Sequence, residues 1–258
     1  MINALKRSQL GRALIEKLIW YKINSRRGRR VTSEQYAELL QRFGSDHAAR
    51  AKFCHDAYLC RVIIDPQVTR CIKKLQADFN LKNFVETGTY DGETSVAMSL
   101  VFDRVLTCDV KDWPRALEFY SADNLTYENK SSPDFLRAHL NDIKKGSFFF
   151  LDAHWGPYWP LREELKIVFD NCENPVIAID DFDAGNGLYY DAYADTKLNL
   201  EYIADSIPGD YKFFVNPRSN RNRGLIFIFP PSAPYGCAFK DRAKYDNDQH
   251  SLWDKLKP

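Results

Sequence analysis

The chain has 258 residues, of which 45% are hydrophobic and 28% charged, and its formal net charge is +1 at pH 7. These values are ordinary for a globular protein with a sizeable core, and the near-neutral charge argues against a nucleic-acid partner. None of the six cysteines forms a C-x-x-C pair, and no apolar run approaches the roughly 18 residues of a membrane span. We therefore expect a cytoplasmic protein with reduced thiols.

The first 78 residues read as a series of helices, because apolar residues recur at helical spacing from "LGRALIEKLIWYKI" to "DPQVTRCIKKLQADF". We predict an N-terminal helical extension over 1–78. Its first 30 residues contain a single acid, Glu16, and nine basic residues: Lys6, Arg7, Arg12, Lys17, Lys22, Arg26, Arg27, Arg29 and Arg30. Such a basic helix fits a face packed on the domain or on a homodimer partner. It also fits peripheral contact with the anionic inner face of a membrane.

Residues 79–258 have the pattern of a second domain in which short β-rich runs alternate with helices. The runs are "NFVET", "RVLTCDV", "LTYEN", "SFFFLDA", "PVIAIDD", "YKFFVN" and "GLIFIFP", and the predicted helices cover 93–102, 114–121, 132–143, 160–171 and 193–206. Strands that alternate with helices indicate an α/β fold with a mostly parallel sheet. The last two runs are joined by a link too short for a crossover helix, which predicts an antiparallel hairpin. This Rossmann-like, seven-stranded arrangement resembles that of class I methyltransferases.

The segment "NFVETGTYDG", residues 83–92, ends a predicted strand with an acid and then places two glycines. Glycines after a first strand let the backbone approach a ligand closely. The acid, Glu86, is a poor neighbour for a pyrophosphate and a good one for a cation. Gly88 and Gly92 with Glu86 therefore favour S-adenosylmethionine over a nicotinamide cofactor.

Two further elements fit the same cofactor. Asp109 ends the next strand 21 residues after Gly88, the usual distance for a carboxylate that binds ribose hydroxyls. The segment 128–132, with Ser131, follows the third strand at the place where an adenine edge would lie. The alternative for Glu86 and Asp109 is that each only caps a helix.

Three acids follow two other predicted strands. Asp152 ends "SFFFLDA", and Asp180 and Asp181 end "PVIAIDD", so all three are expected at one edge of the sheet. Converging carboxylates repel one another unless a cation is present, and oxygen ligands favour Mg²⁺, Mn²⁺ or Ca²⁺. The sequence therefore predicts a divalent metal site, the alternative being that Asp180 or Asp181 caps a loop.

"VETGTYDGETS" and "FFFLDAHW" resemble catechol O-methyltransferase and the metal-dependent macrolide-sugar O-methyltransferases. The resemblance implies that Asp152, Asp180 and Asp181 bind the metal. It also implies a set of cofactor contacts: Glu86, Thr87, Gly88, Tyr90, Gly92, Thr94, Asp109, Ser131, Asp152, His154 and Trp155. The chain departs from the catechol enzyme in the extra residue Ala153 and in Gly156, which stands where that enzyme has a lysine base. A catechol substrate is therefore not expected.

Asp152 and His154 are the candidate catalytic residues. His154 has a suitable intrinsic pKa for a general base, although it equally fits a place beside the adenine. Asn186 and Arg223 are candidate substrate contacts in turn-rich segments. We expect a metal-dependent O-methyltransferase acting on a hydroxyl of a sugar or glycan precursor or another small metabolite. The alternatives are a metal-independent N-methyltransferase and a non-catalytic scaffold with the cofactor fold.

Overall fold

The computed structural model describes residues 66–90, 92–110, 123–154, 158–193, 195–216 and 223–245. The chain divides into two compact units, Met1–Tyr58 and Leu59–Pro258, and all described residues belong to the second. The basic segment 1–30, the predicted helix at 114–121 and Trp155 lie outside the described residues. The predicted domain boundary at 78/79 stays a prediction. Among the described helices, none has the length and apolar character to span a bilayer.

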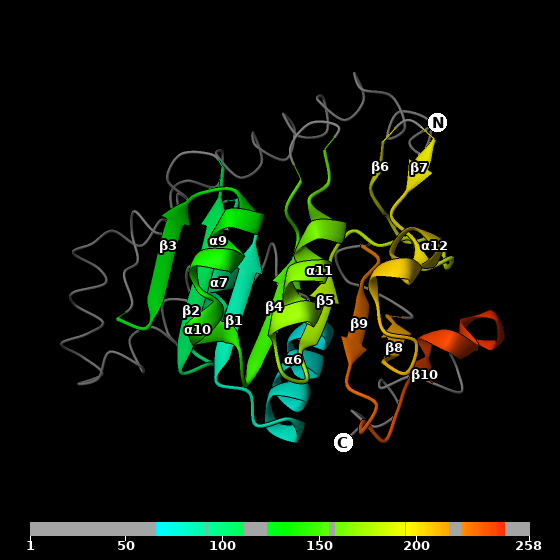
Figure 1. The fold of residues 1–258 in the computed structure, drawn as a ribbon, viewed down its shortest axis with the longest axis horizontal. Coiled ribbons are helices and arrows are strands. Elements are labelled where there is room, and N and C mark those ends of the chain that lie inside the picture. Colours follow the sequence, from blue (N-terminus) through cyan, green and yellow to red (C-terminus); the bar gives the residue numbers. More distant parts are fainter. Residues whose placement is uncertain are drawn as a thin grey trace. The chain divides into compact units, whose positions relative to one another are not determined.

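A single eight-stranded sheet forms the centre of the second unit, in the order β10-β8-β9-β5-β4-β1-β2-β3 (Figure 1). The strands are β1 (Asn83–Thr87), β2 (Arg104–Asp109), β3 (Leu125–Asn129), β4 (Ser147–Leu151), β5 (Val176–Ile179), β8 (Lys212–Val215), β9 (Ile226–Phe229) and β10 (Cys237–Ala238). The first five strands pair in parallel, whereas β9 is antiparallel to both β5 and β8.

The α/β fold class and the C-terminal hairpin are therefore confirmed, but the predicted number of seven strands is wrong. The additional strand, β10, pairs antiparallel with β8 at the edge of the sheet. Its pairing involves only two residues, Cys237 and Ala238, and two residues are too few to show the alternation that marks a strand in a sequence.

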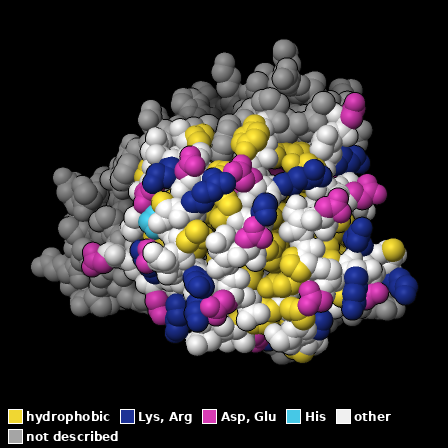
Figure 2. All heavy atoms as spheres, viewed as in Figure 1, with side chains coloured by type: hydrophobic (Ala, Val, Ile, Leu, Met, Phe, Trp, Pro, Cys, Tyr) yellow, Lys and Arg dark blue, Asp and Glu magenta, His cyan; other side chains and the backbone are white. Residues whose placement is uncertain are grey.

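Helices cover both faces of the sheet. They are α6 (Pro66–Asp78), α7 (Glu93–Met98), α9 (Ser132–Ala138), α10 (Leu140–Ile143), α11 (Leu161–Asn171) and α12 (Leu200–Ile203), followed by the 3₁₀ turns η2 (Ala204–Ser206) and η3 (Phe239–Lys244). In Figure 1, α11 lies in front of the sheet and α6 behind it. On the front face, basic and acidic side chains of the described residues are interspersed (Figure 2).

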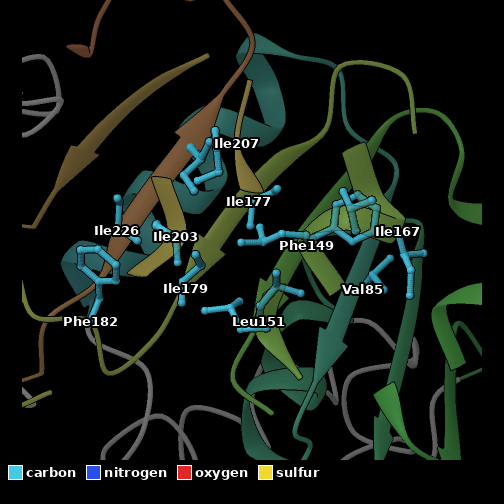
Figure 3. Packing of buried hydrophobic residues seen from close by; sticks show 14 of the residues in the cluster. Val85, Phe149, Leu151, Ile167, Ile177, Ile179, Phe182, Ile203, Ile207 and Ile226 are labelled. Carbon is cyan, nitrogen blue, oxygen red and sulfur yellow. The ribbon is translucent and has the colours of Figure 1, made fainter. Parts of the chain in front are cut away.

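Alternate residues of the central strands point to opposite faces and enter two apolar cores. Phe149 and Leu151 of β4 pack with α9 and α11, whereas Phe148 and Phe150 pack with α6 and α7. Figure 3 shows the first of these cores, with Val85 and Ile179 among its labelled side chains. Because both faces are covered, the central strands β4, β5 and β9 are almost entirely apolar and completely buried.

The predicted helix over 193–206 is wrong for its first half. Residues 192–197 contain a short hairpin, β6 (Ala192–Tyr193) and β7 (Thr196–Lys197). The helix α12 begins only after Asn199, whose side chain accepts a hydrogen bond of 3.0 Å from the Tyr202 amide. Asn199 is a preferred N-cap residue, and it marked this start in the sequence.

Candidate functional site

The carboxyl ends of β1, β2, β4 and β5 meet along one edge of the sheet, and the loop after β1 passes directly over the end of β4. Gly88 has a φ of 84°, and a Cβ atom placed on it would lie 2.5 Å from the backbone oxygen of Asp152. Gly92 has a φ of 82°. Glycine is therefore required at position 88 both for the backbone angle and for the close approach.

Glu86 lies beneath this loop and is almost completely buried. Its carboxylate accepts hydrogen bonds from the Ser95 hydroxyl on α7 and from the Thr107 hydroxyl on β2, the latter at 2.7 Å. Burial raises the pKa of Glu86 to about 7, although the two hydroxyls lower it, and the charges of Asp109 and Asp180 add to the increase. A cationic ligand group at this edge would stabilise the ionised form.

Asp109 contacts the same loop from the end of β2. Its carboxylate accepts a hydrogen bond of 2.8 Å from the backbone amide of Tyr90, which itself has a φ of 48°. The Tyr90 side chain is 66% exposed beside it. Asp109 therefore fixes the path of the loop, and ribose binding by this carboxylate stays a prediction.

Three other predicted cofactor residues lie in different surroundings. Ser131 caps α9, since its hydroxyl accepts from the Asp134 amide and donates to the Asp134 carboxylate at 2.6 Å. The side chain of Thr87 is completely buried, below the loop. Thr94 is half-buried at the start of α7. Cofactor binding by these three residues stays a prediction.

The structure brings together three potential metal ligands. Asp152, His154 and Asp181 each offer one ligand atom, and these atoms lie within 4.8 Å of one another. The set differs from the predicted one, because His154 takes part and Asp180 does not. Asp181 has a φ of 52°, so the chain turns sharply between the two adjacent acids. Metal binding by Asp180, which is buried beside this group, stays a prediction.

Asp181 is the most constrained member of this group. One of its carboxylate oxygens pairs with the guanidinium of Arg223, whereas the other, Oδ1, is buried and has no hydrogen-bond partner among the described residues. Burial and the charge of Asp180 raise the pKa of Asp181 to about 7, and Arg223 opposes this rise. A buried carboxylate oxygen without a donor is well suited to a cation.

A small cavity of about 20 Å³ borders these groups, lined by side chains that include Asp152, His154, Asp180, Asp181, Asp191 and Glu164. This volume holds roughly one water molecule or ion, not a cofactor. Two carboxylates and one imidazole suit Mn²⁺ as well as Mg²⁺, because carboxylates bind both ions and nitrogen ligands favour the softer metals. The residues present therefore fit a divalent ion.

Two acids of this region were not predicted as site residues. Asp191 lies 3.5 Å from His154, measured from Oδ2 to Nε2. Glu164 is completely buried on α11, and neither of its carboxylate oxygens has a hydrogen-bond partner among the described residues. The sequence contained a signal for Glu164, because it lies at helical spacing from Leu161 and Val168 on the apolar face. No comparable signal existed for Asp191, which belongs to a loop.

Asn186 and Arg223, predicted as substrate contacts, take different positions. The Asn186 side chain donates a hydrogen bond of 2.8 Å to the backbone oxygen of Asn216 and is exposed. Arg223 lies within the acidic group, where Asp181, Asp180 and Asp152 raise its pKa although burial opposes the charged form. Substrate contact by either residue stays a prediction.

Comparison with known proteins gives no match to a family model and none to a curated protein sequence. Methyltransferases are among the solved structures that this fold resembles. An O-methyltransferase from Bacillus cereus in complex with SAH has a TM-score of 0.47 and 15% identity over 76% of this chain and 90% of that chain. A protein described as a caffeoyl-CoA O-methyltransferase, from Staphylococcus aureus, has a TM-score of 0.46 and 15% identity over 77% and 98%. A SAM-dependent methyltransferase from Archaeoglobus fulgidus has a TM-score of 0.43 and 10% identity over 63% and 93%. At such scores the likeness does not identify a function.

Proposed function

We propose that this chain is an S-adenosylmethionine-dependent, metal-dependent O-methyltransferase. The observation that carries this proposal is the convergence of Asp152, His154 and Asp181 beside a glycine loop at the carboxyl edge of the sheet. The proposed acceptor is a hydroxyl of a sugar or glycan precursor or of another small metabolite. Ligands of open α/β sheets bind at this edge.

The cofactor would supply a methyl group on a positively charged sulfonium centre. Gly88 lets the loop approach such a ligand, and Glu86 and Asp109 lie at the ends of β1 and β2, beside that loop. Phosphate groups would meet repulsion from the same acids. The charge of the site therefore favours S-adenosylmethionine over a dinucleotide.

A divalent ion held by Asp152, His154 and Asp181 would supply a Lewis acid for the acceptor oxygen. Asp152 is in backbone contact with Gly88, so the metal ligand and the cofactor loop are positioned by the same strand end. The chain's own contribution is mainly to hold two reactants in fixed geometry. In a metal-free mechanism His154, which lies beside Asp191, would instead be the nearest candidate to accept a proton.

Chelation tests this proposal. The full-length protein is assayed for methyl transfer to a panel of nucleotide sugars, lipid-linked glycans, small hydroxylated metabolites and amines, before and after treatment with EDTA. Binding of S-adenosylmethionine is measured in parallel by titration calorimetry. We expect chelation to lower the rate about a thousandfold or more while cofactor binding is retained.

Asp152→Asn should reproduce the loss of rate, and Asp183→Asn is the matched control. Asp183 is an acid of the same sheet edge that accepts a hydrogen bond from Gly185 and pairs with Lys197 at 3.5 Å, outside the metal-binding group. Full activity after chelation would exclude the metal mechanism, and full activity on an amine acceptor would favour the metal-independent N-methyltransferase. Absence of cofactor binding would contradict the assignment as a methyltransferase.

A further inference from the structure

Arg223 is fixed within the acidic group by its backbone as well as by its side chain. Its carbonyl accepts a hydrogen bond of 3.0 Å from the buried Asn216 side chain. The next residue, Gly224, donates its amide to the Tyr189 carbonyl at 2.8 Å. A Cβ atom on Gly224 would lie 1.9 Å from the backbone oxygen of Phe182, so this strand start packs directly against the loop after β5. The position of Arg223 beside Asp181 is therefore built into the fold.

The guanidinium of Arg223 contacts two groups of that loop. It pairs with one carboxylate oxygen of Asp181, and its central carbon lies 5.0 Å from the centre of the Tyr189 ring. A planar cation between a ring and a carboxylate has little freedom to turn. Because Arg223 occupies one oxygen of Asp181, the buried Oδ1 is the oxygen that remains for another cation.

The same loop also orients His154. The Tyr189 hydroxyl donates to Asp191 Oδ1 at 3.3 Å, and Asp191 Oδ2 lies 3.5 Å from His154 Nε2. The backbone amide of Asp191 donates to the carbonyl of Asp181 at 2.8 Å. A neutral imidazole that directs its Nε2 proton to Asp191 presents Nδ1 as a ligand. Arg223, Tyr189 and Asp191 thus connect two of the three potential metal ligands.

We propose that Arg223 and Asp191, joined through Tyr189, form a positioning layer for the metal centre, in which Arg223 orients Asp181 and Asp191 orients His154. This inference rests on the proposed function, because it assumes that the three ligands hold a divalent ion. Residues that hydrogen-bond to metal ligands set their orientation, and their loss commonly costs 10–100-fold in metal affinity. It assigns Arg223 a role other than the substrate contact predicted from the sequence.

Three roles of Arg223 give different results in one experiment. A positioning residue raises the affinity of the metal, a competing cation lowers it, and a substrate contact leaves it unchanged while the KM of the acceptor depends on Arg223. Binding of Mn²⁺ can be followed without turnover, because free Mn²⁺ gives an electron paramagnetic resonance signal that decreases on binding. The measurement therefore needs neither cofactor nor acceptor.

We would titrate Mn²⁺ into the full-length wild-type protein and into Arg223→Gln, Arg223→Lys and Asp191→Asn. The control is Arg162→Gln, since Arg162 lies 4.3 Å from the Tyr202 ring and donates to the Tyr202 carbonyl outside the site. We expect a 10–100-fold loss of Mn²⁺ affinity in Arg223→Gln and Asp191→Asn, a smaller loss in Arg223→Lys and none in the control. Affinity for S-adenosylmethionine should remain within about twofold of wild type in variants with an unchanged melting temperature.

Unchanged or tighter Mn²⁺ binding by Arg223→Gln would overturn the positioning role, provided that the wild-type protein binds Mn²⁺. A wild-type protein that does not bind Mn²⁺ would instead contradict the metal-dependent function and this inference with it. If Arg223→Gln fails to fold, Arg223→Lys and Asp191→Asn decide the question. Wild-type affinity in both would refute the proposal.

Discussion

Glu164 offers a prediction that depends mainly on burial. Its side chain is completely buried on α11, and its two carboxylate oxygens have no hydrogen-bond partner among the described residues. Burial raises the pKa of Glu164 to about 7 from an ordinary value of 4.5, and the nearby hydroxyls of Ser132 and Thr87 oppose this shift electrostatically without reaching hydrogen-bond geometry. Glu164→Gln keeps the size of the side chain and removes its charge.

The direction in which pH changes folding stability follows from the number of protons that Glu164 binds in the folded and in the unfolded chain. Below pH 4.5 Glu164 is protonated in both the folded and the unfolded chain, so its ionisation costs no stability. As the pH rises towards 7, the unfolded chain loses this proton first, and the contribution of Glu164 to folding stability is lost. A pKa difference between 4.5 and about 7 makes this loss about 2.5 kcal/mol between pH 5 and pH 8.

The assay is urea denaturation of the wild-type protein and Glu164→Gln at several values between pH 5 and pH 8. Other buried acids titrate in both proteins and cancel in the difference, so the variant should gain about 2.5 kcal/mol relative to wild type over this range. Glu173→Gln is the control, because its carboxylate is partly exposed, pairs with Lys145 and is not among the groups that shift the pKa of Glu164. If the wild-type and Glu164→Gln curves run parallel, Glu164 is not a buried acid with a raised pKa.

Four further predictions concern the candidate cofactor site and the basic segment 1–30. Gly88→Ala should lower the free energy of unfolding by about 3 kcal/mol or more, because a strained φ and a backbone clash combine. The control is Gly187→Ala, since Gly187 has a similar φ of 81° but open space around it. This variant should lower the free energy of unfolding by only about 1 kcal/mol. Equal losses in urea denaturation would exclude the clash. Asp109→Ala should weaken S-adenosylmethionine binding by about 1.5–3 kcal/mol in titration calorimetry, and unchanged affinity would remove it from the site. Cofactor binding at pH 7 should release protons from Glu86, because a bound cation lowers its raised pKa. The binding enthalpy measured by calorimetry should then depend on the ionisation enthalpy of the buffer. A binding enthalpy that is the same in all buffers would contradict this prediction. If residues 1–30 bind a membrane surface, deleting them should abolish flotation with anionic vesicles. A full-length chain that never floats at any salt concentration leaves only a packing role for that segment.

The sheet was predictable where strands are long, apolar and separated by helices. The run "NFVET" agrees with β1 (Asn83–Thr87) residue for residue, whereas "SFFFLDA" extends two residues beyond β4 (Ser147–Leu151). Both strands were recognisable because helices cover both faces of the sheet and bury them. The hairpin at 192–197 was not predictable in this way. Its two-residue strands are too short to show a period, and apolar residues near 198–203 gave the whole segment a helical appearance.

The site was predictable where its residues follow strands. Asp152 and Asp181 come together because β4 and β5 are neighbours in a parallel sheet, so their carboxyl ends share one edge. Arg223 and Asp191 reach the same place from loops, and the path of a loop is set by tertiary contacts that local sequence patterns do not contain. The contribution of His154 to the metal group likewise depends on how the chain leaves β4.

Three buried acids at this edge, Glu86, Asp181 and Glu164, have pKa values raised to about 7, and each is stabilised by the arrival of positive charge or of a proton. Arg223 compensates one oxygen of Asp181 only. An anionic ligand would add to this excess of negative charge, whereas a sulfonium and a divalent ion would remove it. Because Gly88 touches the backbone of Asp152, the two cations would also be held at a fixed separation, which is the condition that methyl transfer between neighbouring ligands requires. The charge and the geometry of this edge therefore favour the same pair of ligands for independent physical reasons.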